Sequence, residues 1–348
     1  MAAWPYVCFA LIFTVIPLLL MVYFSIRVEI PLDVENQVTL TEAATVSAKD
    51  GSRLKLERGT PLTLTQAMEG VLADGTEVRL PTALGVTSSS GRKLFLVKNN
   101  GVNYGVEFNF GNFVQFFNSA GVTGINCVKV LLNSLYMALI ATALCLLLGY
   151  PLAYILVGMK PFARTFLYFL LLLPMWMNFL IRTYAWRPIL ADNGLIHSLL
   201  KLFGVTNLPQ LMPSDGAVIL GLVYNLLPFM VMPIFNMLVK FDRHLVEAAE
   251  DLGATPTQVF VRIVFPMTLP GVVSGVMMTF LPAMTAFSVT KILGGGKTFL
   301  IGDLIERQFK TDGNWGFGAA VSMILTVIML LSMKALTRAQ QESEGGLM

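Results

Sequence analysis

The chain has 348 residues, of which 55% are hydrophobic and only 13% are charged, and its formal net charge is +3. Its mean hydropathy is +0.70. Soluble domains carry roughly 25% charged residues, so this composition excludes an ordinary soluble globular protein and predicts an integral membrane protein. The small, dispersed net charge argues against nucleic-acid binding. The three cysteines lie in or beside apolar runs without a CxxC spacing, which favours buried hydrophobic roles over a disulfide or metal site.

Uncharged runs are the main feature of the chain, and a helix needs roughly 20 apolar residues to cross a bilayer. The runs are residues 1–26, 130–159, 165–181, 216–239, 263–290 and 313–333. They predict six membrane-spanning helices. The third is short and reaches full length if the side chain of Arg164 or Arg182 extends to the membrane surface. The first has no Lys or Arg before it and no A-x-A site after it, so we expect an uncleaved span rather than a signal peptide.

Residues 27–105 differ in character from the rest of the chain. Alternating polar and apolar residues, as in Arg53–Glu57, are typical of half-buried strands. Gly follows Asp, Ser or Asn at 50–51, 74–75, 90–91 and 100–101, and such pairs form hairpin turns. We therefore predict a small β-rich insertion outside the membrane, on the non-cytoplasmic face. A docking surface and an inert spacer are equally compatible with the pattern. Residues 109–117 then predict an amphipathic segment at the membrane surface.

Basic residues in the short loops indicate the orientation. If both termini are cytoplasmic, one side receives Lys160, Arg164, Lys240, Arg243, Arg262, Lys334 and Arg338. The opposite loops also contain basic residues, partly offset by acidic ones, so the bias is moderate. We expect a multi-pass protein of a bacterial cytoplasmic membrane with both ends inside.

The loop at 241–266 has the marks of an ordered structure. Asp242 can cap the start of a helix over 243–252, and Gly253 suits the left-handed conformation that ends one. Thr255, Pro256 and Gln258 form a capping box, which predicts a second short helix running from Pro256 toward Pro266. Two short, sharply capped helices form a rigid lever.

This loop resembles the EAA loop of binding-protein-dependent ABC importer permeases. That pattern is EAA, three residues, Gly, nine residues and I-x-L-P, and here it is matched by Glu247-Ala248-Ala249, Gly253, Ile263 and Pro266, with Phe265 in place of Leu. The resemblance implies that the loop is the coupling helix, which sits in a groove of a cytoplasmic ATPase. The residues it assigns to ATPase coupling are Glu247, Ala248, Ala249, Asp251 and Gly253.

Further segments resemble the B-type permease subunit of spermidine/putrescine importers. They are 133–142, 174–182, 226–233, 294–297, 300–302 and 315–320. The resemblance implies an all-α membrane protein with the six-helix fold of type I ABC importer permeases, in which 106–338 is the permease core and 339–348 a cytoplasmic tail. It implies as partners a second permease, two ATP-binding-cassette ATPase subunits and an extracytoplasmic substrate-binding protein. The β-rich insertion departs from the family pattern.

A polyamine crossing this subunit would favour aromatic faces and amide or carbonyl oxygens, both of which bind ammonium groups. The candidates for that path are Trp176, Tyr224, Asn225 and Phe287. Asp303 and Glu306 could attract a polycation at the outer mouth. Other solutes, such as an anion or a metal complex, remain alternatives.

Other possible sites find little support in the sequence. Gly296-Lys297-Thr298 resembles the end of a phosphate-binding loop, but position 291, where that pattern needs Gly, is Lys. His197 and His244 are isolated, and we interpret both as solvated loop residues. No Asp or Glu lies inside a predicted span, which argues against an ion-coupled carrier or channel. We therefore expect a transport subunit without a cofactor, metal or catalytic site of its own.

Overall fold

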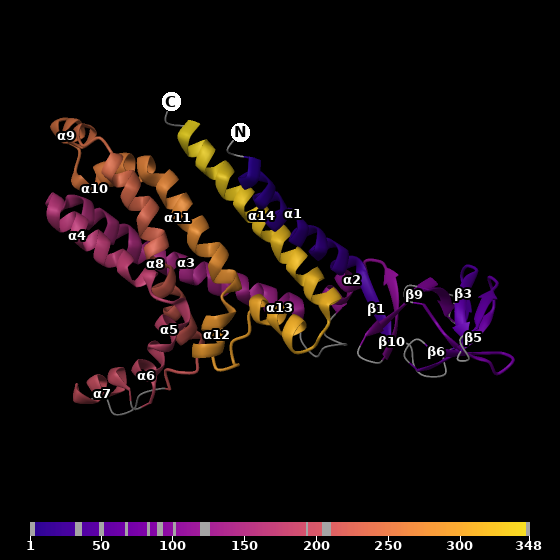
Figure 1. Cartoon of the computed structure of the whole chain (residues 1–348). Helices are drawn as coiled ribbons and strands as arrows, with labels where there is room; N and C mark the ends of the chain where they lie inside the picture. Colours follow the sequence, from indigo (N-terminus) through magenta and orange to yellow (C-terminus); the bar gives the residue numbers. More distant parts are fainter. Residues whose placement is uncertain are drawn as a thin grey trace. The chain divides into compact units, whose positions relative to one another are not determined.

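The computed structural model describes residues 4–31, 37–48, 52–66, 69–81, 84–88, 93–99, 102–118, 126–192, 194–203 and 210–345. The chain divides into two compact units (Figure 1). The first comprises Met1–Asn118 and Asp312–Met323, and the second comprises Ser119–Thr311 and Ile324–Met348.

The first unit contains a ten-stranded antiparallel sheet. Its strands are β1 Arg27–Pro31, β2 Gln37–Leu40, β3 Ala44–Ala48, β4 Arg53–Leu56, β5 Pro61–Gln66, β6 Glu69–Leu72, β7 Glu77–Arg79, β8 Leu84–Ser88, β9 Lys93–Asn99 and β10 Val102–Phe108. Their order in the sheet is β1-β10-β9-β8-β2-β5-β6-β7-β3-β4. The alternation seen in the sequence places one side of the strands in a core that includes Val38, Leu40, Leu62, Leu64 and Val86.

The strands extend beyond residue 105, because β1 pairs with β10 along its whole length, from Arg27 opposite Phe108 to Pro31 opposite Tyr104. The turn at 74–75 joins β6 to β7, and the Thr76 N–H donates to Asp74 Oδ1 over 3.0 Å. This hydrogen bond lowers the pKa of Asp74. The other three expected turns, at 50–51, 90–91 and 100–101, lie outside the described residues.

Three helical segments complete the first unit. They are α1 (Trp4–Ile26), α2 (Gly111–Asn118) and the beginning of α14 (Trp315–Gly345). The side chains of α1 from residue 14 to residue 20 are all exposed in the isolated chain, although most are apolar. A helix that is apolar on every side needs a nonaqueous environment.

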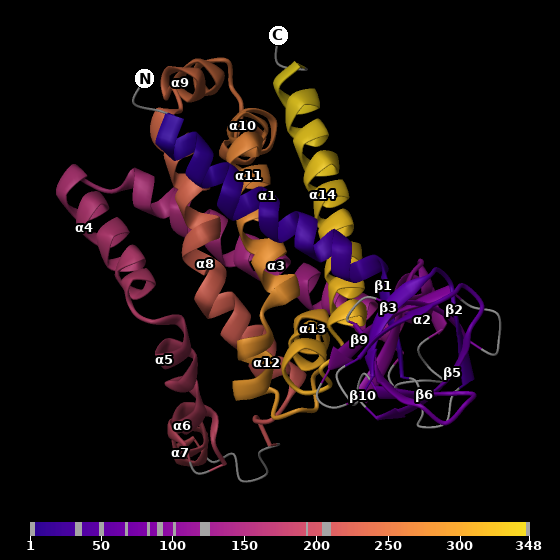
Figure 2. The same cartoon turned by 45° about the vertical axis from the view of Figure 1, so that its right-hand side comes forward.

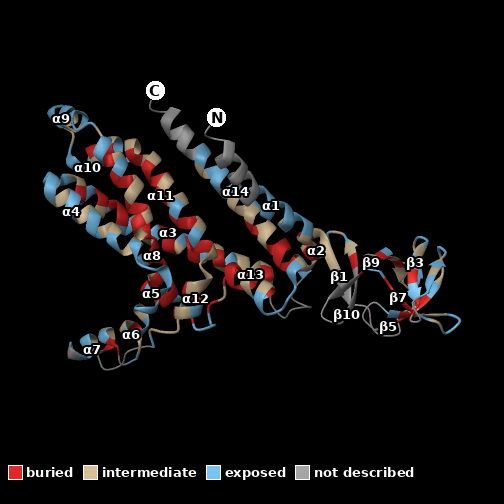
Figure 3. Cartoon of the chain, in the orientation of Figure 1, coloured by how far each residue is buried: buried red, intermediate tan, exposed pale blue. Residues whose placement is uncertain are grey.

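The second unit is built on three long helices that pack on one another: α3 (Cys127–Gly158), α8 (Asp215–Lys240) and α11 (Phe265–Thr285). Figures 1 and 2 show them side by side, and Figure 3 shows buried residues along all three. The hydroxyls of Tyr150 and Thr268 share a hydrogen bond of 2.8 Å that joins α3 to α11. Shielded from water, such polar links hold apolar helices in one register.

Among the described residues, four helices are long and apolar enough to cross a membrane: Cys127–Gly158, Asp215–Lys240, Pro256–Thr285 and Trp315–Arg338. The described apolar part of α1, Thr14–Ile26, is shorter. A fifth candidate span is broken, with an angle of 98° between its two parts.

This broken span is the third run of the sequence. Its first part, Pro161–Trp176, consists of α4 (Pro161–Leu172) and the 3₁₀ turn η2 (Leu173–Trp176). Its second part, Phe179–Lys201, begins with α5 (Phe179–Tyr184). Pro174 cannot donate a backbone hydrogen bond, which favours ending α4 here. The side chain of Arg182 is buried, so of the two residues considered for extension to the membrane surface Arg164 is the one that remains.

The remaining helices are short: α6 (Trp186–Leu190), α7 (Leu195–Leu202), α9 (His244–Asp251), α10 (Pro256–Val259), the π-helical turn η3 (Phe260–Val264), α12 (Phe287–Leu293) and α13 (Ile301–Lys310). His197 lies on α7 and is buried, so its interpretation as a solvated loop residue is wrong. The apolar residues of α7 recur at helical spacing, and His197 is buried with the apolar face of this helix.

Candidate functional site

Helix α9 follows the end of α8 and has capped ends. The His244 N–H donates to Asp242 Oδ1 over 3.0 Å at the beginning of the helix. At the other end, Gly253 has a φ of +83°. The Gly253 N–H donates to the Glu250 carbonyl (2.9 Å) and the Ala254 N–H to the Ala249 carbonyl (3.0 Å), which is a Schellman motif. The local sequence therefore sets both ends of this helix.

The side chains of α9 remain largely accessible, since none of its residues is buried. Leu245, Ala248 and Leu252 are exposed and follow the spacing that places residues on one helix face. Leu252 is 90% exposed and lies on the same face as exposed Leu245, and an apolar face of this kind can dock a partner. The carboxylate of Glu247 contacts His244 Nδ1 at 3.2 Å and is also accessible.

The second capped helix of the loop is α10. The Thr255 N–H donates to Gln258 Oε1 (2.9 Å), and the Gln258 N–H donates to Thr255 Oγ1 (3.4 Å), so both bonds of the capping box are present. This helix does not end near Pro266 as a separate short helix. It continues through η3 into α11, giving one candidate span from Pro256 to Thr285. The wider π-helical turn just before Pro266 accommodates a ring that would otherwise clash with the preceding turn.

Two contacts join this loop to the membrane helix α3. The ring of Phe260 packs edge-on against Tyr150 at 5.7 Å and Tyr154 at 5.9 Å between centroids. The guanidinium of Arg243 donates to the Val157 carbonyl over 3.1 Å. A cavity of about 340 Å³ lies between α9 and the ends of α3 and α8, and Tyr154, Phe241 and Glu247 are among its lining residues. A movement of α9 can therefore reach α3 through Phe260 on η3 and through Arg243.

The candidate path residue Asn225 is engaged by a buried arginine. Arg182 is 6% exposed, and its Nε donates to Asn225 Oδ1 over 2.7 Å. Its Nη1 donates to the Pro174 carbonyl over 2.8 Å. The Asn225 amide nitrogen donates to Thr183 Oγ1 (3.2 Å) and to the Gly221 carbonyl (2.8 Å). The oxygen of Asn225 that could receive an ammonium group is therefore already bonded to a guanidinium.

The two aromatic candidates Tyr224 and Trp176 contact different residues. Tyr224 packs edge-on against Trp186 at 5.2 Å, and the Arg182 guanidinium lies 5.8 Å from the centre of its ring. Trp176 lies on η2, is 80% exposed and packs against Phe169. Tyr224 therefore belongs to the surroundings of Arg182, whereas Trp176 presents an open aromatic surface.

Phe287 begins α12 directly after the break that ends α11. It lines a cavity of about 170 Å³ together with Asn225, Pro282, Thr285 and Ser288. The final carbonyls of a helix carry partial negative charge, and the end of α11 supplies Pro282 and Thr285 to this cavity. The structure thus brings Phe287 and Asn225 to one cavity.

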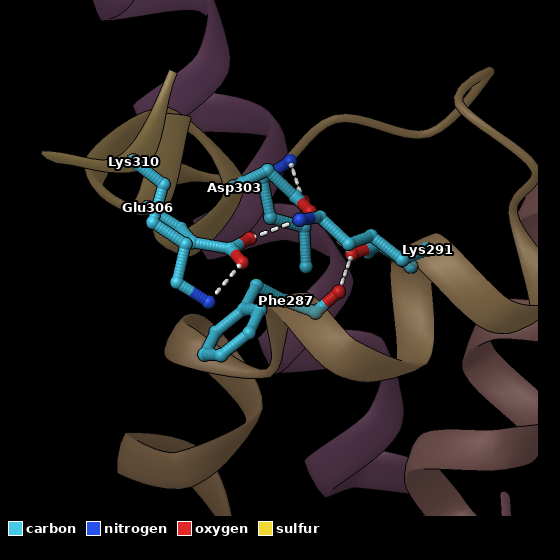
Figure 4. A network of polar contacts seen from close by, with 7 residues as sticks. Phe287, Lys291, Asp303, Glu306 and Lys310 are labelled. Carbon is cyan, nitrogen blue, oxygen red and sulfur yellow. Dashed lines mark hydrogen bonds and ion pairs between the residues drawn. The ribbon is translucent and has the colours of Figure 1, made fainter. Parts of the chain in front are cut away.

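The two acidic candidates on α13 belong to a network that links this helix to α12 (Figure 4). Glu306 pairs with Lys291 and, over 3.0 Å, with Lys310. The Lys291 ammonium lies 5.9 Å from the centre of the Phe287 ring. Burial raises the pKa of Glu306, but the hydrogen bonds and positive charges of the two lysines together lower it by more. The pKa of Glu306 therefore lies below its ordinary value.

Asp303 has a structural environment. The Thr290 hydroxyl is within 2.9 Å of both carboxylate oxygens, and the Leu300 N–H donates to Oδ2 over 2.9 Å at the start of α13. The side chain is buried, and burial raises the pKa of Asp303 above its ordinary value. With two lysines balancing Asp303 and Glu306, this corner presents no excess negative charge from these four residues.

Comparison with known proteins identifies the family. Residues 145–342 match the model of the binding-protein-dependent transport system inner membrane component family. This chain belongs to that family. The match includes α9, so the exposed helix between α8 and α10 is part of the family's shared region.

Curated relatives and solved structures agree with this family assignment. The spermidine/putrescine transport system permease protein PotB of Escherichia coli K12 is 46% identical over 214 residues, covering 61% of this chain and 78% of the relative. The protein of the same name from Haemophilus influenzae is 40% identical over 248 residues, covering 71% and 85%. A chain of a bacterial ABC transporter that imports alginate has a TM-score of 0.56 at 15% identity, covering 68% of this chain and 84% of that one. The chain is thus an inner membrane permease with a helical fold of this class.

Sequence reasoning did not single out Arg182, Leu245 or Leu252. For Leu245 and Leu252 the sequence did contain a signal, because together with Ala248 they recur at the spacing of one helix face in an otherwise polar segment. Arg182 stood beside an apolar run, which suggested a terminus rather than a buried cation. Its role depends on Asn225, a residue on a different helix.

Proposed function

We propose that this chain is the membrane-spanning permease subunit of an ATP-binding-cassette importer that brings polyamines, such as spermidine and putrescine, into the cytoplasm. The observation that carries the proposal is the 46% identity to a spermidine/putrescine permease over 214 residues. The exposed and sharply capped helix α9 supports it, because an importer permease must present a rigid surface to its ATPase.

The proposed topology has six spans: α1, α3, the broken α4–α5 segment, α8, α10–α11 and α14. With both termini in the cytoplasm, α9 and the basic residues Lys160 and Arg164 lie on the same side, in agreement with the distribution of positive charge. The sheet formed by β1–β10 is then an extracytoplasmic insertion. In this arrangement the core begins after the sheet and ends with α14.

The mechanism follows from α9. Two ATPase subunits bind and hydrolyse ATP, and one of them receives the apolar face of α9 together with Glu247, Ala248, Ala249, Asp251 and Gly253. Closure of the ATPases moves α9, and this movement passes to α3 through Arg243 and through Phe260. The permease pairs with a second permease of different sequence, and a loaded substrate-binding protein docks from outside. The chain itself carries no ATPase site.

Among the candidate path residues, Phe287 has the best setting for an ammonium group, because its ring lines the cavity at the end of α11. Asn225 and Tyr224 act by holding Arg182, and Asp303 by capping α13. Trp176 offers an open ring to the substrate or to the second permease. Glu306 becomes available to a polycation only when Lys291 or Lys310 moves away.

The experiment is reconstitution of the chain with its co-encoded permease, ATPase and binding protein, followed by measurement of ATP hydrolysis. Spermidine or putrescine should stimulate hydrolysis when the binding protein is present. Stimulation by an anion or a metal complex instead would retain the importer and reject the polyamine. If no solute stimulates ATP hydrolysis by an intact assembly, and the assembly instead accumulates substrate when an ion gradient is imposed, an ion-coupled carrier would be favoured.

A further inference from the structure

Helix α2 is fastened to the point where α1 ends. The Asn112 side-chain amide donates to the Ser25 carbonyl over 3.0 Å and to the Arg27 carbonyl over 2.9 Å. The Asn109 N–H donates to the Ile26 carbonyl over 2.9 Å. The bonds to Ser25 and Ile26 satisfy carbonyls that the end of α1 leaves without intrahelical partners, and the bond to Arg27 reaches the first residue of β1. The short helix therefore has a defined place at the end of α1.

The beginning of α14 meets α1 and α2 at the same place. A Cβ atom on Gly316 would lie 2.5 Å from the Arg27 carbonyl oxygen and 3.0 Å from the Asn112 amide nitrogen, so only glycine allows this approach. Trp315 is the first residue of a candidate membrane span. Because a span begins where the hydrocarbon layer begins, Trp315 marks the depth of the membrane surface for all three segments.

Aromatic rings form a continuous series at this level. The ring centroids of Phe108 and Tyr23 are 5.7 Å apart, those of Tyr23 and Phe24 are 5.4 Å apart, and those of Phe24 and Trp315 are 6.1 Å apart. The guanidinium of Arg27, the first charged residue of the chain, lies 6.0 Å from the centre of the Phe24 ring. Tryptophan and tyrosine collect at the boundary between lipid chains and headgroups, and arginine favours the headgroup phosphates.

One face of α2 is apolar and uncovered. Phe110 and Phe117 are 71% and 69% exposed, and Val114 between them is also exposed. Val114 and Phe117 lie on one face of α2, and Phe110, directly before the helix, continues the same spacing, while Asn112 and Phe116 on the other side are buried. The sequence contains no charged residue between Glu107 and Lys129. Exposed phenylalanines in a segment of this kind would be unfavourable in water.

We propose that α2 is an in-plane membrane helix whose Phe110, Val114 and Phe117 insert into the headgroup boundary of the leaflet at which α1 ends. The lipid surface is the occupant, because α2 is hydrogen-bonded to the end of α1, where the aromatic residues Tyr23 and Trp315 are also exposed, and because α14 is a candidate span. The helix then sets the height at which β1 and β10 leave the membrane. It gives the sheet an anchor that is independent of the transport path.

The test uses spin labels on the full chain in the assembled importer, reconstituted in phospholipid nanodiscs. Cys8, Cys127 and Cys145 are first replaced by serine or alanine, and labels are attached at Val114→Cys and Phe117→Cys. Thr45→Cys, at an exposed position on β3, is the matched control. We expect the ratio of collisions with oxygen to collisions with a water-soluble nickel chelate to be roughly threefold or more higher at the two α2 positions than at residue 45.

Equal ratios at all three positions would show that α2 lies in water and would overturn the proposal. Labels shielded from both reagents, in the assembly or only after the binding protein is added, would show that protein covers this face, which also overturns it. Stimulation of ATP hydrolysis by the loaded binding protein, measured on the labelled importer in the same nanodiscs, verifies folding. If Phe117→Cys loses this stimulation, Phe110→Cys replaces it, since Phe110 continues the same spacing directly before α2.

Discussion

At the scale of single residues, the guanidinium of Arg182 is the most informative group. It is buried among neutral oxygens from Asn225 and Pro174 and lies beside the ring of Tyr224. A buried cation is costly unless its hydrogen bonds are made, and within a membrane segment the cost is greater. The Asn225 side chain is therefore a structural partner of Arg182, which the residue types alone could not reveal.

Asn225→Leu should destabilise the permease, because it removes the acceptor of a hydrogen bond from a buried charge. We expect a loss of about 2 kcal/mol and a lower midpoint of thermal unfolding in detergent. Asn225→Asp, which places a carboxylate beside the guanidinium, should retain or raise the midpoint. Tyr224→Phe is the control, since it keeps the aromatic ring beside Arg182 and leaves both hydrogen bonds intact. Equal midpoints for Asn225→Leu and the wild type would disprove the structural role.

At the scale of elements, α9 shows how local chemistry defines a functional helix. Asp242 begins it, Gly253 ends it, and the capping box at Thr255 begins the next helix within a few residues. Each of these signals acts on its immediate neighbours, so sequence alone predicted both helix starts. The extent of the second helix was not predictable in this way, because η3 carries it past Pro266 into the span.

Leu252→Asp should uncouple transport without affecting folding. The side chain is 90% exposed, so its replacement costs the isolated permease little, whereas a carboxylate on the docking face would oppose an apolar ATPase groove. We expect substrate-stimulated ATP hydrolysis to fall by roughly tenfold or more, equivalent to about 1.4 kcal/mol of binding energy. Glu250→Ala, at an exposed position on the opposite face of α9, is the control and should retain activity. Full stimulation in Leu252→Asp would place the ATPase elsewhere.

At the scale of the whole molecule, the chain combines a helical unit with a sheet-containing unit. In chain order the first and last strands of the sheet are β1 and β10, which pair with each other, and Val28 lies opposite Glu107. The Cα atoms of such a pair lie about 5 Å apart. The sheet can therefore be removed at this pair without separating α1 from α2.

Deletion of residues 29–106, with Val28 joined to Glu107 by Asn-Gly, should give a protein that still inserts into the membrane. A two-residue turn of this type matches the twist of an antiparallel pair, and the bonds from Asn109 and Asn112 to the end of α1 remain. Protease protection in membrane vesicles measures insertion. Deletion of α2 alone is the contrasting variant and should impair it. If the protein without residues 29–106 is degraded while the protein without α2 inserts normally, then the sheet rather than α2 is needed for insertion, and the prediction is wrong.

What the sequence by itself determined was the membrane environment, the change from helices to strands after residue 26, and the capped helix with its EAA pattern. Each depends on properties of consecutive residues: length without charge, alternation, and cap chemistry. The tertiary structure alone decided which polar groups are paired, because their partners are distant along the chain. Asn225 meets Arg182 and Tyr150 meets Thr268 only when α5, α8, α3 and α11 pack together. For the same reason, the sequence could not show that Asp303 accepts a hydrogen bond from Thr290 on α12, or that Glu306 pairs with Lys291 on α12 and Lys310 on α13.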